Sequence, residues 1–265
     1  MSRVPVVLSV AGSDPSGGAG VQADLKTATA LGVYAGAVLT ALTAQNTTGV
    51  QGIHAVPAAF VRDQLDSVLS DLDVRVVKIG MLGTPDVARV VADALRRHAV
   101  AHVVLDPVMV ASSGDRLVPE ETVRVVVDEL LPLATLVTPN VPEAELLTGA
   151  TVAAVAGLER AGRLLVDAGA GAALVKGGHL AGPRSVDVLV GADGTTRLEA
   201  PRVETPHTHG TGCTLSSAVA AFLVRGAPLP DAVARAKDYL VAALASGSRR
   251  EVGSGHGPVD HLAGR

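Results

Sequence analysis

The sequence of 265 residues predicts an α/β fold in which a mostly parallel central sheet is covered by helices on both faces. Short apolar runs alternate with helical patterns along the chain, as expected for repeated strand, helix and strand units. Hydrophobic residues make up 48% of the chain but aromatic residues only 2%, so the core must be aliphatic, as buried parallel strands favour. Because no repeat, low-complexity tract or linker divides the chain, we expect a single domain over residues 1–265.

The first half of the chain starts with an apolar strand at 4–11, a glycine-rich loop at 12–20 and then a helical pattern. The runs 57–72 and 85–98 also have helical patterns, and proline stands at or near the start of each, where helices tolerate it. The further strands expected in this half cover residues 35–44, 76–80 and 101–105, with an edge strand at 51–56.

The second half continues the same alternation. Two runs, 186–190 and 195–199, flank Asp193-Gly194, a dipeptide typical of tight hairpin turns. The glycine-rich tail at 253–258 is expected to be irregular. The remaining elements expected are helices at 120–131, 157–168, 214–225 and 230–246, and strands at 135–137 and 172–175.

Charge and composition argue against several classes of partner. The net charge of −4, the absence of a basic run and the scarcity of aromatic residues disfavour nucleic acid and anionic membranes, so the partner should be a small molecule. The single cysteine cannot form an internal disulfide, and the N-terminus lacks a signal-peptide pattern. No apolar stretch reaches the roughly 20 residues needed to span a bilayer. We therefore expect a cytoplasmic protein.

A polar loop at 205–214 runs directly into an apolar, alanine-rich segment, and this junction predicts a helix N-terminus. Gly210 and Gly212, on either side of Thr211, remove Cβ atoms that would block a ligand, so backbone N–H groups can hold an anion such as phosphate. Cys213 lies on the same turn, where the helix dipole favours a thiolate that could act as base or nucleophile. The alternative, that the turn only caps a helix and Cys213 is a small buried residue, stays open.

Polar side chains recur where the predicted strands end, and ligands of open α/β sheets bind outside those carboxyl ends. Asp106 and Glu143 are oxygen ligands suited to Mg²⁺. Lys176 adds a positive charge, and these parts together match phosphoryl transfer. The strand-end residues are Asp14, Gln45, Met81, Asp106, Asn140 with Glu143, and Lys176.

Several motifs resemble the hydroxymethylpyrimidine and hydroxymethylpyrimidine-phosphate kinases of thiamine biosynthesis, a family of the ribokinase-like superfamily. The resemblance covers nearly the whole chain and implies one ribokinase-like domain that uses ATP and Mg²⁺. It implies phosphorylation of 4-amino-5-hydroxymethyl-2-methylpyrimidine, then of its monophosphate to the diphosphate, by a homodimer. The motifs lie at residues 11–27, 43–47, 78–82, 106–109, 138–144, 176–179, 209–214 and 255–258.

The resemblance also implies roles for individual residues. Gln45 would hydrogen-bond the pyrimidine edge, and Cys213 would be the base, with Lys176 as the second catalytic residue. Most ribokinase-like sugar kinases have aspartate in place of Cys213, so this assignment rests on the narrower family. The remaining implied residues are Gly12, Asp24, Met81 and Val108 for the pyrimidine pocket; Thr138, Asn140 and Thr208 for ATP; Gly210, Thr211 and Gly212 for the anion hole; and Asp106 and Glu143 for the metal.

Three alternatives remain. The nearest is a pyridoxal kinase of the same superfamily, because pyridoxal also carries a hydroxymethyl group on a six-membered aromatic ring. A cysteine hydrolase pairing Cys213 with His207 or His209 would leave Asp106, Lys176 and the Asn140-x-x-Glu143 motif without roles. A nonenzymatic vitamin-binding protein would not need the candidate base and metal ligands. Lys237 also resembles the family, although a lysine on a late helix is expected to be exposed.

Overall fold

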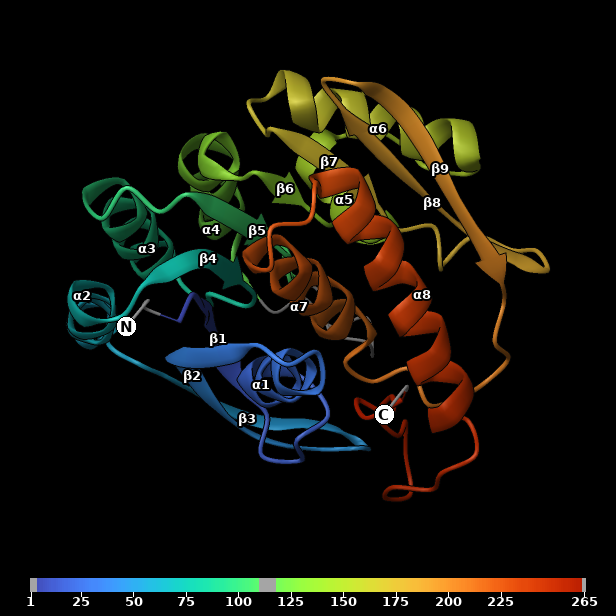
Figure 1. Ribbon diagram of the computed structural model, residues 1–265, viewed down its shortest axis with the longest axis horizontal. Coiled ribbons are helices and arrows are strands. Elements are labelled where there is room, and N and C mark those ends of the chain that lie inside the picture. The colour runs from blue at the N-terminus through green and yellow to red at the C-terminus, as the bar shows by residue number, and fades with distance from the viewer. Residues whose placement is uncertain (1–3, 110–117, 264–265) are drawn as a thin grey trace.

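The computed structural model describes residues 4–109 and 118–263. Within them the strands form one nine-stranded sheet (Figure 1). The strands are β1 (Val6–Ser13), β2 (Tyr34–Asn46), β3 (Gly49–Ala55), β4 (Val74–Ile79), β5 (His102–Leu105), β6 (Leu136–Val137), β7 (Ala172–Val175), β8 (Arg184–Gly191) and β9 (Gly194–Pro201). The helices are α1 (Gly20–Ala30), α2 (Ala58–Asp71), α3 (Pro85–Arg97), α4 (Glu120–Val125), α5 (Val141–Thr148), α6 (Val155–Asp167), α7 (Thr211–Val224) and α8 (Leu229–Gly247).

The sheet has the order β3-β2-β1-β4-β5-β6-β7-β8-β9. Its centre, from β2 to β7, is parallel, whereas β3, β8 and β9 pair antiparallel at the two ends. This confirms the predicted mostly parallel sheet. The hairpin of β8 and β9 is also confirmed, and a two-residue turn joins its last pair, Gly191 and Gly194.

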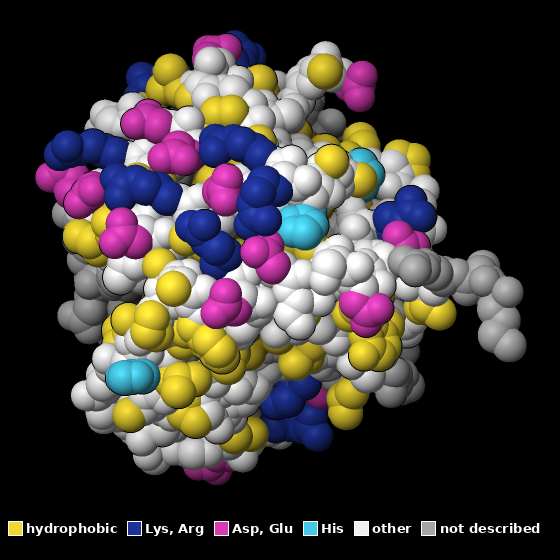
Figure 2. All heavy atoms as spheres, turned by 90° about the vertical axis from the view of Figure 1, so that its left-hand side faces the viewer, with side chains coloured by type: hydrophobic (Ala, Val, Ile, Leu, Met, Phe, Trp, Pro, Cys, Tyr) yellow, Lys and Arg dark blue, Asp and Glu magenta, His cyan; other side chains and the backbone are white. Residues whose placement is uncertain are grey.

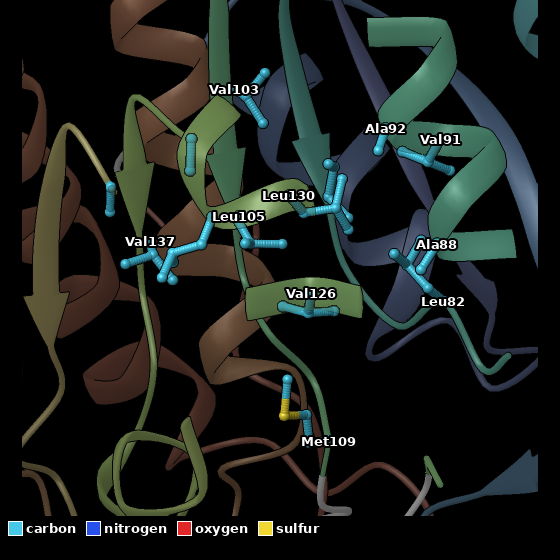
Figure 3. Close-up of a cluster of buried hydrophobic side chains, with 14 of the residues drawn as sticks. Leu82, Ala88, Val91, Ala92, Val103, Leu105, Met109, Val126, Leu130 and Val137 are labelled. Atoms are coloured by element: carbon cyan, nitrogen blue, oxygen red, sulfur yellow. The ribbon is translucent and has the colours of Figure 1, made fainter. Parts of the chain in front are cut away.

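Two aliphatic cores cover the two faces of the sheet, as the sequence predicts. One contains side chains from α2, α3, α4, α5 and α6, and the other contains side chains from α1, α7 and α8. In Figure 1, α1, α7 and α8 lie on the near side of the sheet. Figure 3 shows part of the first core, where Leu105 and Val137 of neighbouring strands lie with Val126, Leu130 and Val91. Strands buried on both faces therefore carry continuous aliphatic runs.

The helix predicted at 120–131 differs from the structure. It begins as α4, but the chain then forms a π-helical segment at Val126–Leu130 and a 3-10 turn at Leu131–Leu133. Pro132 has no N–H with which to continue the α-helical hydrogen bonds, which explains why the regular helix ends.

Helix α5 was not predicted, although its signals are present. Asn140 and Glu143 form a capping box, Pro142 stands in the first turn, and Gly149 ends the helix in the left-handed conformation. The same Asn140-x-x-Glu143 motif thus shapes the chain as well as the candidate site.

The tail at 253–258 is irregular, as predicted, but it is held by hydrogen bonds. The His256 N–H donates to the Thr47 carbonyl at 2.8 Å, and the His209 N–H donates to the Gly257 carbonyl at 3.1 Å. The tail thereby connects the β2–β3 turn to the loop before α7. Among the helices of residues 4–109 and 118–263, none has the length and apolar character needed to cross a membrane.

Candidate active site

A cavity of about 750 Å³ opens at the carboxyl ends of the parallel strands. Because these ends meet at one edge of the sheet, loops far apart in the sequence contribute to a single wall. The cavity is lined by most of the site residues predicted from the sequence: Gly12, Gln45, Met81, Asp106, Val108, Asn140, Glu143, Lys176, Thr208, Gly210, Thr211, Gly212 and Cys213.

The N-terminus of α7 forms one part of this wall. Gly210 adopts a left-handed conformation with φ of 76°, and a Cβ atom there would lie 1.8 Å from the Gly18 carbonyl oxygen. A Cβ atom on Gly212 would lie 3.1 Å from the Lys176 Nζ atom. Helix α7 has no side-chain cap, and the Thr211 N–H donates to the Thr208 carbonyl at 3.2 Å, so Gly212 and Cys213 are the first-turn residues whose N–H groups can face an anion.

Lys176 and Asp106 form an ion pair at the cavity wall, with Nζ and Oδ1 2.9 Å apart. Asp106 also accepts hydrogen bonds from the hydroxyls of Thr138 at 3.0 Å and Ser216 at 3.4 Å. Burial by itself raises the pKa of Asp106, but Lys176 and Lys78 outweigh it and hold this pKa below its usual range. Burial lowers the pKa of Lys176, whereas Asp106 and Glu143 raise it above its usual value. Both groups are therefore charged at neutral pH.

Glu143 lies beside this pair and closes the capping box of α5. Its carboxylate accepts the Asn140 N–H at 2.8 Å, and the Asn140 side chain accepts the Glu143 N–H at 3.0 Å. Burial raises the pKa of Glu143 to about 7, with Asp106 acting in the same direction and Lys176 against it. A neighbouring cation would stabilise the ionised carboxylate.

Asp14, His209 and Gln45 line another part of the cavity. The His209 Nε2 atom lies 2.8 Å from the Asp14 Oδ2 atom and 3.5 Å from the Gln45 Nε2 atom. Burial alone raises the pKa of Asp14, but hydrogen bonds led by that from His209 hold it at about 2. His209 is not among the site residues predicted for a kinase, and the only signal that pointed to it is its place at the start of the 209–214 motif. Its ring is bonded to a carboxylate beside the residue predicted to contact the pyrimidine.

The histidines do not support the hydrolase alternative. Within the described residues, neither His207 nor His209 forms a hydrogen bond with Cys213. His209 is bonded to Asp14, and the His207 Nδ1 atom accepts the Gly257 N–H at 3.1 Å. A cysteine nucleophile would need one of these rings as its base.

The predicted activation of Cys213 by the helix N-terminus is wrong for the free protein. Burial raises the pKa of the Cys213 thiol to about 11, against the effect of Lys78. The carboxylates of Asp24 and Asp106 also disfavour the thiolate, while the Gly20 N–H favours it. Desolvation outweighs the favourable effects of Lys78 and the Gly20 N–H, so the thiol is protonated at neutral pH.

Three residues do not lie as the sequence predicted. Asp24, 3% exposed, is not part of the cavity wall but accepts hydrogen bonds from Lys78 at 2.9 and 3.0 Å. Thr138 is fully buried and also outside the wall, with its hydroxyl bonded to Asp106 rather than free for ATP. Lys237 is buried rather than exposed, and its Nζ atom lies 2.6 Å from the Asp187 carboxylate. In each case a partner distant in sequence determines the orientation.

Known proteins resemble this chain over nearly its full length. A hydroxymethylpyrimidine/phosphomethylpyrimidine kinase of Rhizobium meliloti (strain 1021) is 51% identical over 97% of both chains. The enzyme of the same description from Escherichia coli (strain K12) is 49% identical over 96% of both chains. These are relatives at high coverage, and both carry the activity that the motifs imply.

Solved structures match the fold. Phosphomethylpyrimidine kinase from Clostridium difficile 630 superposes with a TM-score of 0.81 at 38% identity, covering 91% of this chain and 100% of that chain. An ADP complex of Bacillus subtilis pyridoxal kinase gives a TM-score of 0.91 at 34% identity, covering 98% of both chains. The predicted ribokinase-like fold is thus confirmed. Since a family model described as phosphomethylpyrimidine kinase also matches residues 14–260, the chain belongs to the phosphomethylpyrimidine kinase family.

Proposed function

We propose that this protein transfers the γ-phosphate of ATP to 4-amino-5-hydroxymethyl-2-methylpyrimidine, and then phosphorylates the monophosphate to the diphosphate, in thiamine biosynthesis. The observation that carries the proposal is one cavity that joins the α7 N-terminus, the Lys176–Asp106 pair and the Gln45 amide. Such a transfer needs hydrogen-bond donors that hold an anion, a fixed positive charge and a polar group that binds a heterocycle. The 49–51% identity to kinases of this description supports the same substrate.

In the proposed reaction the substrate hydroxymethyl oxygen bonds to the γ-phosphorus as the bond to the leaving ADP oxygen breaks. The hydroxyl proton passes to the Cys213 sulfur in the molecules whose thiol is ionised, a small fraction of the free protein at neutral pH because the pKa of this thiol is about 11. Lys176 and the N–H groups at the start of α7 neutralise negative charge on the oxygens of the phosphoryl group while that group is transferred. Asn140 and Thr208, which line the cavity, contact ATP, whereas Thr138 acts through its hydrogen bond to Asp106.

Pyridoxal phosphorylation is the second candidate, because pyridoxal kinases superpose with TM-scores up to 0.92. Their identity to this chain is lower, at 31–34% in the superposed structures. The deciding experiment incubates the protein with Mg-ATP and, separately, hydroxymethylpyrimidine, its monophosphate, pyridoxal and ribose, and identifies the products by mass. We expect the pyrimidine diphosphate as the final product. A higher kcat/KM for pyridoxal would replace the proposal with the second candidate.

Gln45→Ala should raise the KM for the pyrimidine much more than the KM for ATP. A site that hydrogen-bonds a ring discriminates less well when that bond is removed. The kcat/KM for the pyrimidine should therefore fall by about 10-fold or more. Steady-state kinetics with each substrate varied in turn measures this. Gln51→Ala is the matched control, because Gln51 is exposed on β3 outside the cavity wall. Equal losses toward both substrates would remove Gln45 from the pyrimidine site.

We propose that Asp106 and Glu143 hold Mg²⁺ together with water and ATP phosphates. No group of three His, Cys, Asp or Glu side chains in residues 4–109 and 118–263 forms a metal cage. The two carboxylates nevertheless fit Mg²⁺, which takes few protein ligands, and their mutual repulsion at Glu143 would be relieved by a cation. When bound, the ion would neutralise charge on the transferring phosphates.

Glu143→Gln should raise the Mg²⁺ concentration required for half-maximal activity by about 10-fold, the lower end of the cost of losing a metal-site group. The fold should persist, because glutamine can also complete a capping box. A magnesium titration of the initial rate checks this. Glu145→Gln on the same helix is the control, since its carboxylate binds the Val152 N–H at 2.7 Å outside the cavity wall. Superimposable titrations of Glu143→Gln and wild type would exclude the metal role.

We also propose a homodimer formed through the edge at β3. Every residue of β3 except Gly49 is exposed, including Ile53 at 51%, which also lines the rim of the cavity, and Tyr34 of β2 and Phe60 of α2 are also exposed apolar side chains. Figure 2 shows hydrophobic side chains gathered on this side of the molecule, below a band of charged residues. An unpaired apolar edge strand usually requires cover, and a second copy presents the same edge.

The cytoplasmic location remains a prediction.

Ile53→Asp should convert the dimer to a monomer, because it places a charge in the centre of this apolar edge. Light scattering after size exclusion gives the mass directly. Val252→Asp, at another apolar position that is 46% exposed, should leave the mass unchanged. A wild-type protein that is monomeric at micromolar concentration would contradict the proposal.

A further inference from the structure

His209 and Gln45 both line the cavity, but the proposed reaction uses only Gln45. The His209 ring is fixed in place by its neighbours. Its Nε2 atom lies 2.8 Å from the Asp14 carboxylate, and its side chain is only 12% exposed. A Cβ atom on Gly18 would lie 2.5 Å from the ring, so the glycine-rich loop packs directly against it. The ring therefore presents one definite edge to the Gln45 amide.

The contact with Asp14 decides which atom of His209 carries a proton. Three backbone N–H groups of residues 16–19 also donate to the Asp14 carboxylate, which is ionised at neutral pH and can only accept. The His209 Nε2 atom must therefore donate to it, whether the ring is neutral or charged. Toward its other neighbour, the Gln45 amide at 3.5 Å, this atom has no lone pair to offer.

The second neighbour of the Gln45 amide is the Thr43 hydroxyl, at 3.1 Å. This hydroxyl also lies 2.8 Å from the Ser13 carbonyl oxygen, which can only accept. A hydroxyl has a single proton, and the shorter contact with Ser13 uses it. Thr43 therefore offers the amide a lone pair and requires a donor in return.

A glutamine amide has an oxygen and a nitrogen of nearly the same shape, so a half turn about its last bond exchanges them. With the nitrogen at His209 and the oxygen at Thr43, donor meets donor and acceptor meets acceptor. After the half turn, the oxygen faces the His209 N–H and the nitrogen donates to Thr43. Both neighbours therefore favour the same orientation of Gln45.

We propose that His209 is a specificity-determining residue, which together with Thr43 fixes the Gln45 amide with its oxygen toward His209 and its nitrogen toward Thr43. The proposal rests on the proposed function and deepens it. In 4-amino-5-hydroxymethyl-2-methylpyrimidine the amino group donates and the neighbouring ring nitrogen accepts. The amino group then binds on the His209 side of the amide, and the ring nitrogen binds on the Thr43 side.

The same orientation directs the reacting group of the substrate. The hydroxymethyl group is attached next to the amino group, on the side away from this ring nitrogen. Because His209 immediately precedes Gly210, a ring bound in this way turns its hydroxymethyl group toward the start of α7 and Cys213. A reversed amide would turn that group toward Thr43 instead.

The test compares two rings whose donor and acceptor are exchanged at this edge. One is the 4-amino substrate, and the other is 5-hydroxymethyl-2-methylpyrimidin-4(3H)-one, in which the ring N–H donates and the 4-oxygen accepts. Calorimetry without ATP measures the Kd of each ring. The wild type should prefer the 4-amino ring by about 100-fold, because the other ring leaves two polar groups of the amide facing groups of their own kind.

His209→Leu should narrow this ratio of Kd values by about tenfold, because it removes the N–H that opposes the half turn. Thr43→Val removes the other constraint without changing the shape of the side chain, so it should narrow the ratio as well, and the double variant should narrow it further. A purely structural role predicts equal weakening of both rings and an unchanged ratio. His102→Leu, at the exposed start of β5 outside the cavity wall, is the control and should keep the wild-type ratio.

A folded His209→Leu protein with the wild-type ratio would overturn the proposal, and Thr43→Val takes its place in the comparison if His209→Leu does not fold. A wild type that binds both rings equally would also overturn it. Binding of neither ring would overturn this proposal and the proposed substrate together. Because Kd requires no turnover, the predicted ratios without any phosphorylated product would contradict the proposed function alone.

Discussion

Cys213→Ala is expected to lower kcat for the first phosphorylation by about 10²- to 10⁴-fold, while the affinities for ATP and pyrimidine stay near wild type. A positioned base contributes this much, and the remaining catalysis comes from Lys176 and the backbone donors of α7. Because the pKa of Cys213 is about 11, the thiolate fraction of the wild type rises with pH throughout the neutral range. The wild-type rate should therefore increase with pH by up to about tenfold per unit, and Cys213→Ala should lose this dependence.

Single-turnover rates between pH 6 and pH 9 on both proteins measure these effects, with binding followed separately by calorimetry. Cys213→Ser should also be slow, since a hydroxyl is a much weaker acid than a thiol and provides little anion. Alkylation should inactivate the wild type, and the pyrimidine should protect it. The Cys213→Ala protein, which has no other thiol, is the control for the reagent. If Cys213→Ala keeps a near-wild-type kcat, the proton passes to phosphate or water and Cys213 only packs.

Lys176→Met is expected to lower kcat by about 10²- to 10³-fold, because it removes a fixed charge aimed at the transferring phosphoryl group. It should also destabilise the fold by about 3 kcal/mol, the lower end of the cost of breaking a buried ion pair, since the Lys176 side chain is 14% exposed. Asp106 would keep its hydrogen bonds from Thr138 and Ser216 but lose its cation.

The double variant Lys176→Met/Asp106→Asn separates the two effects. It contains no unpaired carboxylate, so its stability in urea should recover relative to Lys176→Met, whereas its kcat should not. Lys26→Met removes the same charge from an exposed position and should leave kcat unchanged. A Lys176→Met protein with wild-type single-turnover rates would show that the ion pair is structural.

The sequence could predict those parts of the site whose positions follow from the order of the strands alone. Aliphatic runs alternating with helical patterns determine a parallel sheet, and parallel strands end at one edge. Asp106, Asn140 and Lys176 follow three neighbouring strands, so their convergence at one cavity follows from the chain order. Gly210 was identified for a different reason, because the absence of a Cβ atom leaves room for a ligand. The structure adds that the Gly18 carbonyl oxygen would lie 1.8 Å from such a Cβ atom.

Only the tertiary structure decided which polar groups face the cavity and what charge they carry. Asp24 lies on a helix whose pattern gives no sign that Lys78 and Ser217, 54 and 193 residues away, will enclose it. His209 meets Asp14 across 195 residues, and Thr138 turns toward Asp106 rather than toward the cavity. The pKa of Cys213 is set by burial among these groups, and burial depends on every element packed around the sulfur. Local pattern fixes where a strand ends, whereas desolvation and pairing are properties of the assembled fold.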